Sequence, residues 1–123
     1  MSMARVFVVG LAGDKAHARE SAGGAPMVRF SVGVHRVRPG GEIITDWHEC
    51  VAFGRAVEPA KSIRQGDLVI LEGRLEYLKD AKGGKRASIV ADRIEVWAAS
   101  KRREEEREAP AVVGGGEEEA EEW

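Results

Sequence analysis

The sequence predicts an all-β domain over about residues 3–97, a small closed barrel of five strands with one short helix, followed by a disordered acidic tail over residues 98–123. Three observations predict it. Segments with the alternation or the apolar character of strands recur along the domain. One stretch with helical spacing lies between the third and fourth of them, and the patterning ends near residue 98. Closing a barrel removes exposed sheet edges; an open α+β sheet is the alternative.

The first three strands follow from apolar runs and alternation. Arg5–Leu11 is an apolar run that is ended by Gly13 and Asp14, which favour a turn. In Met27–His35, valine and phenylalanine alternate with polar residues or glycine, which predicts a strand with one buried face. Pro-Gly-Gly at 39–41 predicts a turn, and Ile43–Phe53 follows as the third strand.

The second half of the domain contains the helix and the last two strands. Ala56–Arg64 has apolar residues at helical spacing and is soon followed by a glycine, which predicts a short helix. Asp67–Lys79 and Arg86–Trp97 are predicted as two long strands. The Asp-Ala-Lys-Gly-Gly-Lys segment at 80–85 is expected to join them as a hairpin loop.

Charge is unevenly divided between the domain and the tail. Residues 1–97 carry 15 Lys and Arg against 12 Asp and Glu, a net of +3, whereas residues 98–123 carry 4 against 9, a net of −5. The tail combines charged runs with a proline and three glycines, so it lacks the apolar surface that folding needs. A basic body with an acidic tail is typical of proteins with a nucleic-acid or membrane partner.

Composition and spacing argue against several chemistries. The single cysteine, Cys50, excludes an intramolecular disulfide and indicates a reducing cytoplasm. His17, His35 and His48 stand at no metal-ligand spacing, and neither a phosphate loop nor a nucleophile elbow is present. No apolar run approaches the roughly 18 residues of a membrane span. We therefore expect no enzyme activity, no metal or other cofactor, and no membrane partner.

Two aromatic residues of the third predicted strand carry the strongest functional signal. Trp47 and Phe53 are six residues apart, so alternation puts both on one face with Glu49 and Val51 between them. At about 3.3 Å per residue the rings stand ~20 Å apart, the reach of several extended nucleotides. Aromatic rings on a strand stack on unpaired bases, at roughly 1–3 kcal/mol per base. The alternative is that both rings are core residues.

Basic residues of the neighbouring strand and of the loops can reach phosphates near these rings. They are Arg29, Arg36, Arg38, Lys79, Lys82, Lys85 and Arg86. Phosphate contacts of this kind fix a nucleic acid without reading its sequence. The alternative is that they are ordinary solvated charges.

Three collinear segments resemble the bacterial single-stranded DNA-binding protein family. Thr-Asp-Trp-His-Glu-Cys-Val-Ala-Phe-Gly at 45–54 is similar to a strand of that family, and Gln-Gly-Asp-Leu-Val-Ile-Leu-Glu-Gly-Arg-Leu at 65–75 is similar to a turn and strand that follow it. A weaker match, Val-Gly-Leu-Ala-Gly-Asp at 9–14, opens the first loop. The resemblance covers about residues 4–97.

The resemblance implies an OB-fold, assembled as a homotetramer around which single-stranded DNA wraps. Such a protein is expected in the cytoplasm, associated with the nucleoid. It also implies no catalysis, metal or cofactor. The family's matching Trp and Phe stack on bases, so the same is expected of Trp47 and Phe53. Arg19 and Arg74 match positions where the family often has basic or polar groove residues. Tyr77 is a third stacking candidate, although alternation equally allows it in the core.

The sequence departs from the family pattern at several positions. Further tryptophans are common in the family at places that fall here near Arg38 and Asp80. Glu76 stands where a basic residue is common, and Lys15-Ala16 replaces an Asp-Pro pair. These departures imply weaker binding per subunit or a larger share of electrostatics.

The end of the chain is expected to bind partners. The family ends in an acidic tip with a hydrophobic terminus, which docks genome-maintenance proteins. Here the corresponding residues are Glu121, Glu122 and Trp123, with Trp in place of the family's Pro-Phe and Glu in place of Asp. The alternative is a tail that only improves solubility.

The sequence therefore predicts non-sequence-specific binding and protection of single-stranded DNA in replication, repair and recombination. Two other functions stay open. One is a specialised paralogue or primosome-type OB protein that also binds RNA. The other is an interaction module that mainly binds protein partners.

Overall fold

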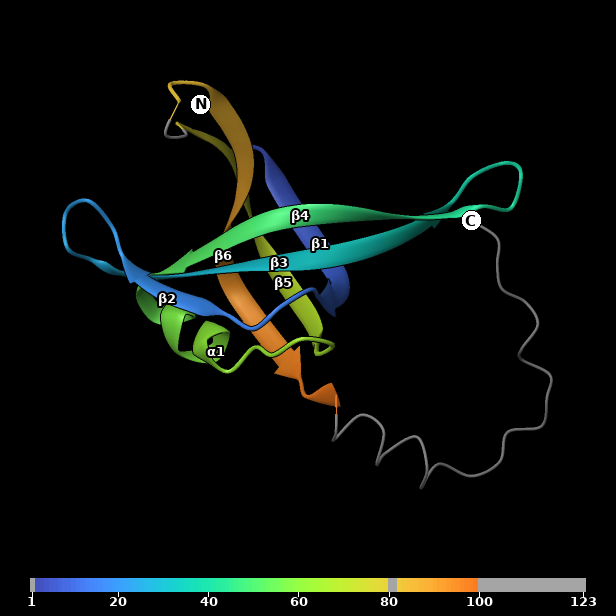
Figure 1. The fold of residues 1–123 in the computed structure, drawn as a ribbon. Coiled ribbons are helices and arrows are strands. Elements are labelled where there is room, and N and C mark those ends of the chain that lie inside the picture. The colour runs from blue at the N-terminus through green and yellow to red at the C-terminus, as the bar shows by residue number, and fades with distance from the viewer. Residues whose placement is uncertain (1, 80–81, 100–123) are drawn as a thin grey trace.

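The computed structural model describes residues 2–79 and 82–99 (Figure 1). The described strands and helices are β1 (Arg5–Ala12), β2 (His17–Glu20), β3 (Pro26–Val37), β4 (Ile43–Phe53), a 3₁₀ turn (Gly54–Ala56), α1 (Val57–Lys61), β5 (Leu68–Lys79) and β6 (Lys85–Trp97). Asp80 and the predicted partner-binding residues Glu121, Glu122 and Trp123 lie outside the described residues.

The strands form one sheet in the order β1-β5-β6-β4-β3-β2. The sheet closes because Leu11 and Ala12 of β1 also pair with Gly33 and Val32 of β3. All strand pairs are antiparallel except β4 and β6, which run parallel over a few residues. With α1 between β4 and β5, this is the closed barrel of the predicted OB-fold.

Two local predictions differ from the structure. The short strand β2 is a sixth strand that the sequence pattern did not predict, because His-Ala-Arg-Glu has no apolar alternation and all four residues are exposed. The predicted helix Ala56–Arg64 is shorter in the structure. After Lys61, the amides of Ser62 and Ile63 bond to carbonyls three residues back, so the last turn is of the 3₁₀ type.

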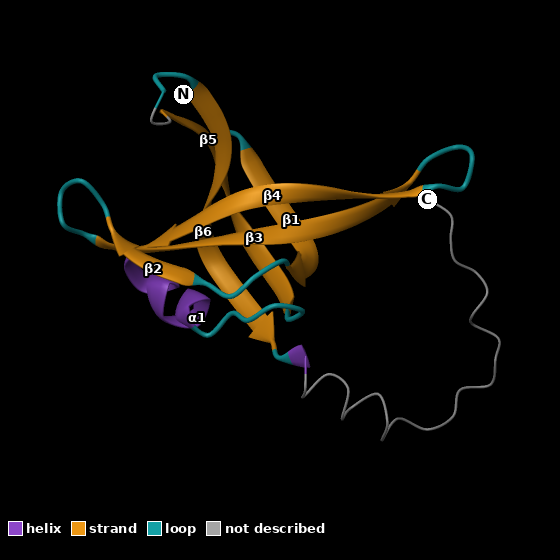
Figure 2. Cartoon of the chain, in the orientation of Figure 1, coloured by secondary structure: helices purple, strands orange, loops and turns teal. Residues whose placement is uncertain are grey.

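Two long hairpins, β3–β4 and β5–β6, position the surfaces of interest. In Figure 2 the β3–β4 hairpin runs across the view and the β5–β6 hairpin rises from it, with their loops pointing in different directions. The hairpins meet where Cys50 to Ala52 of β4 pair with Ile89 to Ala91 of β6. Beyond this junction the two hairpins diverge.

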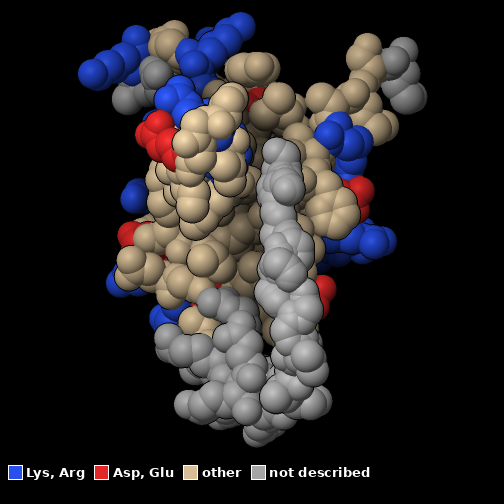
Figure 3. All heavy atoms as spheres, turned by 90° about the vertical axis from the view of Figure 1, so that its right-hand side faces the viewer, with Lys and Arg blue, Asp and Glu red and all other residues tan. Residues whose placement is uncertain are grey.

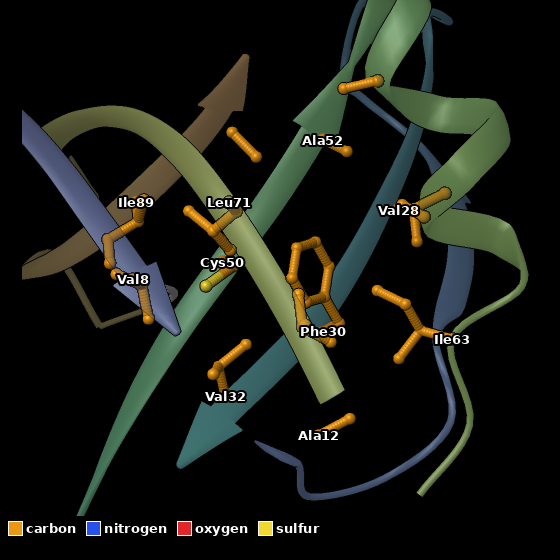
Figure 4. Close-up of a cluster of buried hydrophobic side chains, with 14 of the residues drawn as sticks. Val8, Ala12, Val28, Phe30, Val32, Cys50, Ala52, Ile63, Leu71 and Ile89 are labelled. Atoms are coloured by element: carbon orange, nitrogen blue, oxygen red, sulfur yellow. The ribbon is translucent and has the colours of Figure 1, made fainter. Parts of the chain in front are cut away.

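The core fills the barrel with aliphatic side chains around Phe30 (Figure 4). Val28, Phe30 and Val32 alternate along β3 and point inward, as the sequence predicts, and Ile63 after α1 is buried against them. Burying each such side chain contributes roughly 1.5–3 kcal/mol. Cys50 lies in the same core, and burial raises the pKa of its thiol to about 12, so the thiol is protonated near neutral pH.

Two glycines allow strands to approach closely. A Cβ on Gly10 would overlap the carbonyl oxygen of Gly33, and a Cβ on Gly73 would overlap the carbonyl oxygen of Val90. Gly73 also follows the β-bulge in the β5–β6 pairing. Any side chain at Gly10 or Gly73 would therefore have to move backbone.

Candidate nucleic-acid interface

The outer side of β4 carries the two predicted stacking residues. Trp47 is 59% exposed and Phe53 is 39% exposed. In the strand register Trp47 lies beside Gly33 and Phe53 lies beside Met27 of β3. Both rings are therefore on the surface, and the alternative that they are core residues is wrong.

The surface between the two rings is hollowed. Val51 is only 3% exposed, because it pairs with Arg29 of β3 on one side and with Val90 of β6 on the other. A depression at this point is lined from both hairpins, including Leu78 and Arg86 of the β5–β6 hairpin. We call the surface formed by Trp47, Glu49, Val51 and Phe53, with the neighbouring side chains of β3 and β6, the aromatic face.

Glu49 lies at the centre of the aromatic face and links the two hairpins. Its carboxylate forms ion pairs with Arg29 of β3, at 3.8 Å, and with Arg86 of β6. The hydroxyl of Ser88 on β6 donates to the main-chain carbonyl of Glu49 over 3.4 Å. Three neighbouring depressions all include Glu49 in their lining. Two predicted phosphate-binding arginines are thus held on the aromatic face by a carboxylate, Arg29 beside Val51 and Arg86 beside Trp47.

Two other predicted phosphate contacts, Arg36 and Arg38, also have acidic partners. Arg36 Nε lies 2.6 Å from a carboxylate oxygen of Asp46, and Arg38 Nη1 lies 3.6 Å from one of Glu42. These pairs occur at the end of the β3–β4 hairpin, on exposed side chains. Exposed ion pairs contribute little to stability, so a phosphate group can replace the carboxylate at low cost.

A charged network adjoins the Phe53 end of the aromatic face. Arg74 pairs with Glu76 at 2.5 Å and with Asp92 at 3.3 Å, and Asp92 also binds Arg5 at 2.6 Å. The hydrogen bond to Glu76 raises the pKa of Arg74, and the hydrogen bond to Asp92 raises that of Arg5. A depression beside Phe53 is lined by three basic residues that the sequence pattern did not reveal, namely Arg5, Arg55 and Arg93. They come from three separate segments, so no local motif signals them.

The predicted lysines lie near the end of the β5–β6 hairpin. Lys79 and Lys85 are cross-strand partners, and exposed Lys82 lies in the segment between them. Figure 3 shows Lys and Arg side chains gathered at the upper end of the molecule, where this hairpin ends. Lys79 also lines the depression beside Arg29 and Arg86. Arg19 of β2 lines the next depression, again with Arg29, so β2 brings it to the same surface.

Tyr77 lies on the surface of the same hairpin. It is 66% exposed and pairs with Ala87, so the core position that alternation allowed is wrong for this residue. Leu75, two residues earlier, lines a depression with Trp47 and half-buried His48. Alternation along β5 therefore directs Tyr77 to the side of the strand that borders Trp47.

The loop between β1 and β2 borders the aromatic face. Asp14 accepts a hydrogen bond from the Lys15 amide at 2.7 Å and contacts His17 Nε2 at 3.2 Å. Both contacts lower the pKa of Asp14 below its usual value, and the hydrogen bond from the Lys15 amide is the larger cause. Within residues 2–79 and 82–99, no group of three potential metal ligands occurs. None of the helices in these same segments is long and apolar enough to cross a bilayer.

A second exposed surface lies on the outer side of β1, β5 and β6. After Arg5, the outward residues of β1 are apolar, and Phe7 is 72% exposed. Val9 pairs with Ile70 and Leu11 with Leu68 of β5. We call the surface formed by Phe7, Val9, Leu11, Leu68, Ile70 and Trp97 the apolar face. Among the described residues, Arg5 to Gly10 pair with β5 alone, which leaves the other edge of β1 open.

Comparisons with known proteins agree with this architecture. The Single-strand binding protein family matches residues 3–97. A solved structure, the small single-stranded DNA-binding protein from Streptomyces coelicolor, is 25% identical, with a TM-score of 0.64 over 77% of this chain and 93% of that chain. A deletion mutant of the single-stranded DNA binding protein from Thermus aquaticus shares the fold, at 22% identity and a TM-score of 0.61 over 76% of this chain and 50% of that chain.

A search among curated proteins gives no match. The family match nevertheless spans most of the sequence, including every described strand. It also includes Trp47, Phe53 and the arginines around them. The chain belongs to the single-strand binding protein family.

Proposed function

We propose that the protein binds and protects single-stranded DNA without sequence preference, through residues 3–97, and that it acts in replication, repair and recombination without catalysing a reaction. The observation that carries this proposal is the exposure of Trp47 and Phe53 on one face, between arginines of both hairpins. Stacked bases would cover the exposed surface of these two rings, which the folded chain leaves in contact with solvent. The family and the DNA-binding protein from Streptomyces coelicolor support the same function.

In this function the aromatic face supplies stacking and its surroundings supply charge. Bases stack on Trp47, Phe53 and Tyr77, an interaction that tolerates any sequence because every base has a π-face. Phosphates take the place of the carboxylates that now pair with the arginines, since an arginine fork binds either group. The proposed phosphate contacts are Arg19, Arg29, Arg36, Arg38, Arg74, Lys79, Lys82, Lys85 and Arg86.

A fluorescence titration with poly-dT, poly-rU and duplex DNA tests the proposed function. We expect tight, salt-sensitive binding of poly-dT and quenching of tryptophan emission. Equal affinity for poly-rU would replace the proposal with a specialised accessory protein that also binds RNA. No binding to any of the three would leave a protein-docking module.

We also propose that the chain forms a homo-oligomer, a tetramer, through the apolar face. Phe7 and Val9 expose large apolar side chains on a strand whose outer edge is open, and contiguous apolar patches of this kind mark protein interfaces. One aromatic face contacts only a few nucleotides, so several linked copies raise the affinity for a long strand. A monomeric mass by light scattering at micromolar concentration would contradict this assembly.

For the acidic end of the chain we propose docking of genome-maintenance proteins through Glu121, Glu122 and Trp123. The support is the sequence pattern alone. Trp123 would enter an apolar pocket of the partner while acidic groups meet its Arg or Lys side chains. Deleting residues 117–123 should abolish co-purification of partners and tighten DNA binding modestly at low salt. No change in either measurement would leave the segment as a solubilising tail.

A further inference from the structure

The indole of Trp47 lies against two glycines that come from different segments. Gly33 of β3 is its cross-strand partner, and Gly13 belongs to the loop after β1. A Cβ on Gly33 would lie 2.8 Å from Trp47 Cζ3, and a Cβ on Gly13 would lie 2.5 Å from the same atom. Gly33 points to the outer side of the sheet, yet it is buried. The far edge of the indole therefore occupies the space that side chains at Gly13 and Gly33 would fill.

Backbone conformation does not account for glycine at either position. Neither Gly13 nor Gly33 has a positive φ. The described glycines that do have a positive φ are Gly24, Gly41, Gly54, Gly66 and Gly83. Neither glycine therefore lies in the left-handed region that side chains disfavour. At both positions the atom nearest to an added Cβ is Cζ3 of the indole; the other close atoms also belong to side chains, with Thr45 Cγ2 at 3.0 Å for Gly33 and Ser31 Oγ at 3.1 Å for Gly13. The absence of a side chain there is explained by the ring.

The backbone beneath the ring is held in place. The amide of Gly13 donates to the carbonyl of Ser31 at 3.1 Å, and the amide of Ala12 donates to the carbonyl of Asp67 at 2.9 Å. Gly33 pairs with Leu11 of β1 as well as with Trp47. An added methyl group would therefore displace the ring rather than the backbone.

We propose that Gly13 and Gly33 are positioning residues for base stacking by Trp47. They let one side of the indole rest on bare backbone, which fixes the direction in which its other side meets solvent. This inference rests on the proposed DNA-binding function. A methyl group at either glycine would lift the edge of the ring and turn its free side away from the strand of DNA, while the core stays intact.

The test uses the full chain labelled with 5-fluorotryptophan, with each ¹⁹F signal assigned by a Trp→Phe substitution. We expect Gly33→Ala and Gly13→Ala to shift the Trp47 signal and not the Trp97 signal. Their melting temperatures should not fall, because alanine restricts the unfolded chain more than glycine does. Their affinity for poly-dT should fall about fivefold or more, the lower bound for removing one stacked base. Gly40→Ala is the matched control, since Gly40 has no positive φ and no neighbour within 4 Å of an added Cβ.

A double-substitution cycle separates positioning from a general structural effect. In a Trp47→Phe background the benzo edge of the indole is gone, so Gly33→Ala should cause no further decrease in affinity. An additive decrease, or an unshifted Trp47 signal in the single variants, would overturn the proposal. If the Trp47 signal shifts but neither Gly33→Ala nor Trp47→Ala changes the affinity for DNA, the packing of the indole on the glycines stands and the stacking function of Trp47 is wrong.

Discussion

The aromatic face and the apolar face both expose large side chains, but they are built differently. On the aromatic face, Trp47 and Phe53 are separated by Glu49 and by buried Val51, with arginines on either side. On the apolar face, the exposed residues of β1 are all apolar from Phe7 to Leu11; Val9 and Leu11 lie beside Ile70 and Leu68 of β5, and only Phe7 has a charged partner, Glu72. Spaced rings among cations suit a charged polymer with stackable bases, whereas contiguous apolar side chains suit another protein surface. Exposure alone does not identify a partner; spacing and charge do.

The largest expected effect comes from placing a charge on the apolar face. Phe7→Asp should dissociate the proposed oligomer, raising its dissociation constant by about 30-fold or more, because a buried aromatic at an interface contributes about 2 kcal/mol or more. Sedimentation velocity measures the mass, and a short oligo-dT measures binding per subunit, which should not change.

Ile43→Asp is the control for that substitution. Ile43 is also an exposed apolar residue, but it begins β4 beside the β3–β4 loop, away from the apolar face. If Ile43→Asp dissociates the protein and Phe7→Asp does not, the interface lies elsewhere and the comparison of the two faces is wrong.

Truncating the rings of the aromatic face should weaken DNA binding and leave the oligomer intact, the reverse of the effects expected for Phe7→Asp. Trp47→Ala and Phe53→Ala should each weaken poly-dT binding by roughly 1–3 kcal/mol, with the oligomer and the circular dichroism spectrum unchanged. Val9→Ala on the apolar face should leave the binding of a short oligo-dT, which measures binding per subunit, as it is. Wild-type affinity in either ring variant would remove that ring from the interface.

Neutralising the end of the β5–β6 hairpin should change the salt dependence of binding. Replacing Lys82, Lys85 and Arg86 together with Gln should reduce the slope of log affinity against log salt by about 0.7 for each phosphate that is no longer neutralised. Base preference should not appear, because phosphate contacts carry no sequence information. An unchanged slope across a salt titration would show that this hairpin does not contact the DNA backbone.

The smallest expected effect is a gain in affinity from Glu49→Gln. Glu49 pairs with Arg29 and Arg86, so removing its charge should free both for phosphates and tighten poly-dT binding by about 0.2–1 kcal/mol, the range of an exposed ion pair. Glu58→Gln is the control, since Glu58 pairs with Lys61 on α1. Weaker binding in the Glu49 variant would mean that the carboxylate is needed to order the two arginines.

The strands were largely predictable from sequence because burial of one sheet face imposes alternation. The observed bounds of β3 to β6 lie within two residues of the predicted ones. β2 was missed because an exposed strand of His17–Glu20 has no buried side to reveal it. The apolar run of β1 predicted a strand, but not that Phe7 and Val9 face outward, since that depends on the closure of the barrel.

The aromatic face was only partly predictable. Alternation placed Trp47 and Phe53 on one side, and the family resemblance favoured stacking, but their exposure follows from the strands that flank β4 in the fold. The ion pairs of Glu49 join segments that are far apart in the chain. The same holds for the packing of Trp47 on Gly13, which no local pattern indicates.

The strand order also sets the sequence of events during synthesis. β1 forms most of its strand pairing with β5, where Arg5 lies opposite Arg74. The barrel is complete only when β6 has also paired with β4. A nascent chain that ends in α1 therefore holds a paired β3–β4 hairpin beside a β1 strand whose residues Arg5 to Gly10 still lack their pairing partner. Such long-range pairing slows folding, and it leaves the apolar side chains of β1 accessible until the residues up to Trp97 have left the ribosome. Chaperone binding to the growing chain should therefore be strongest before β6 emerges.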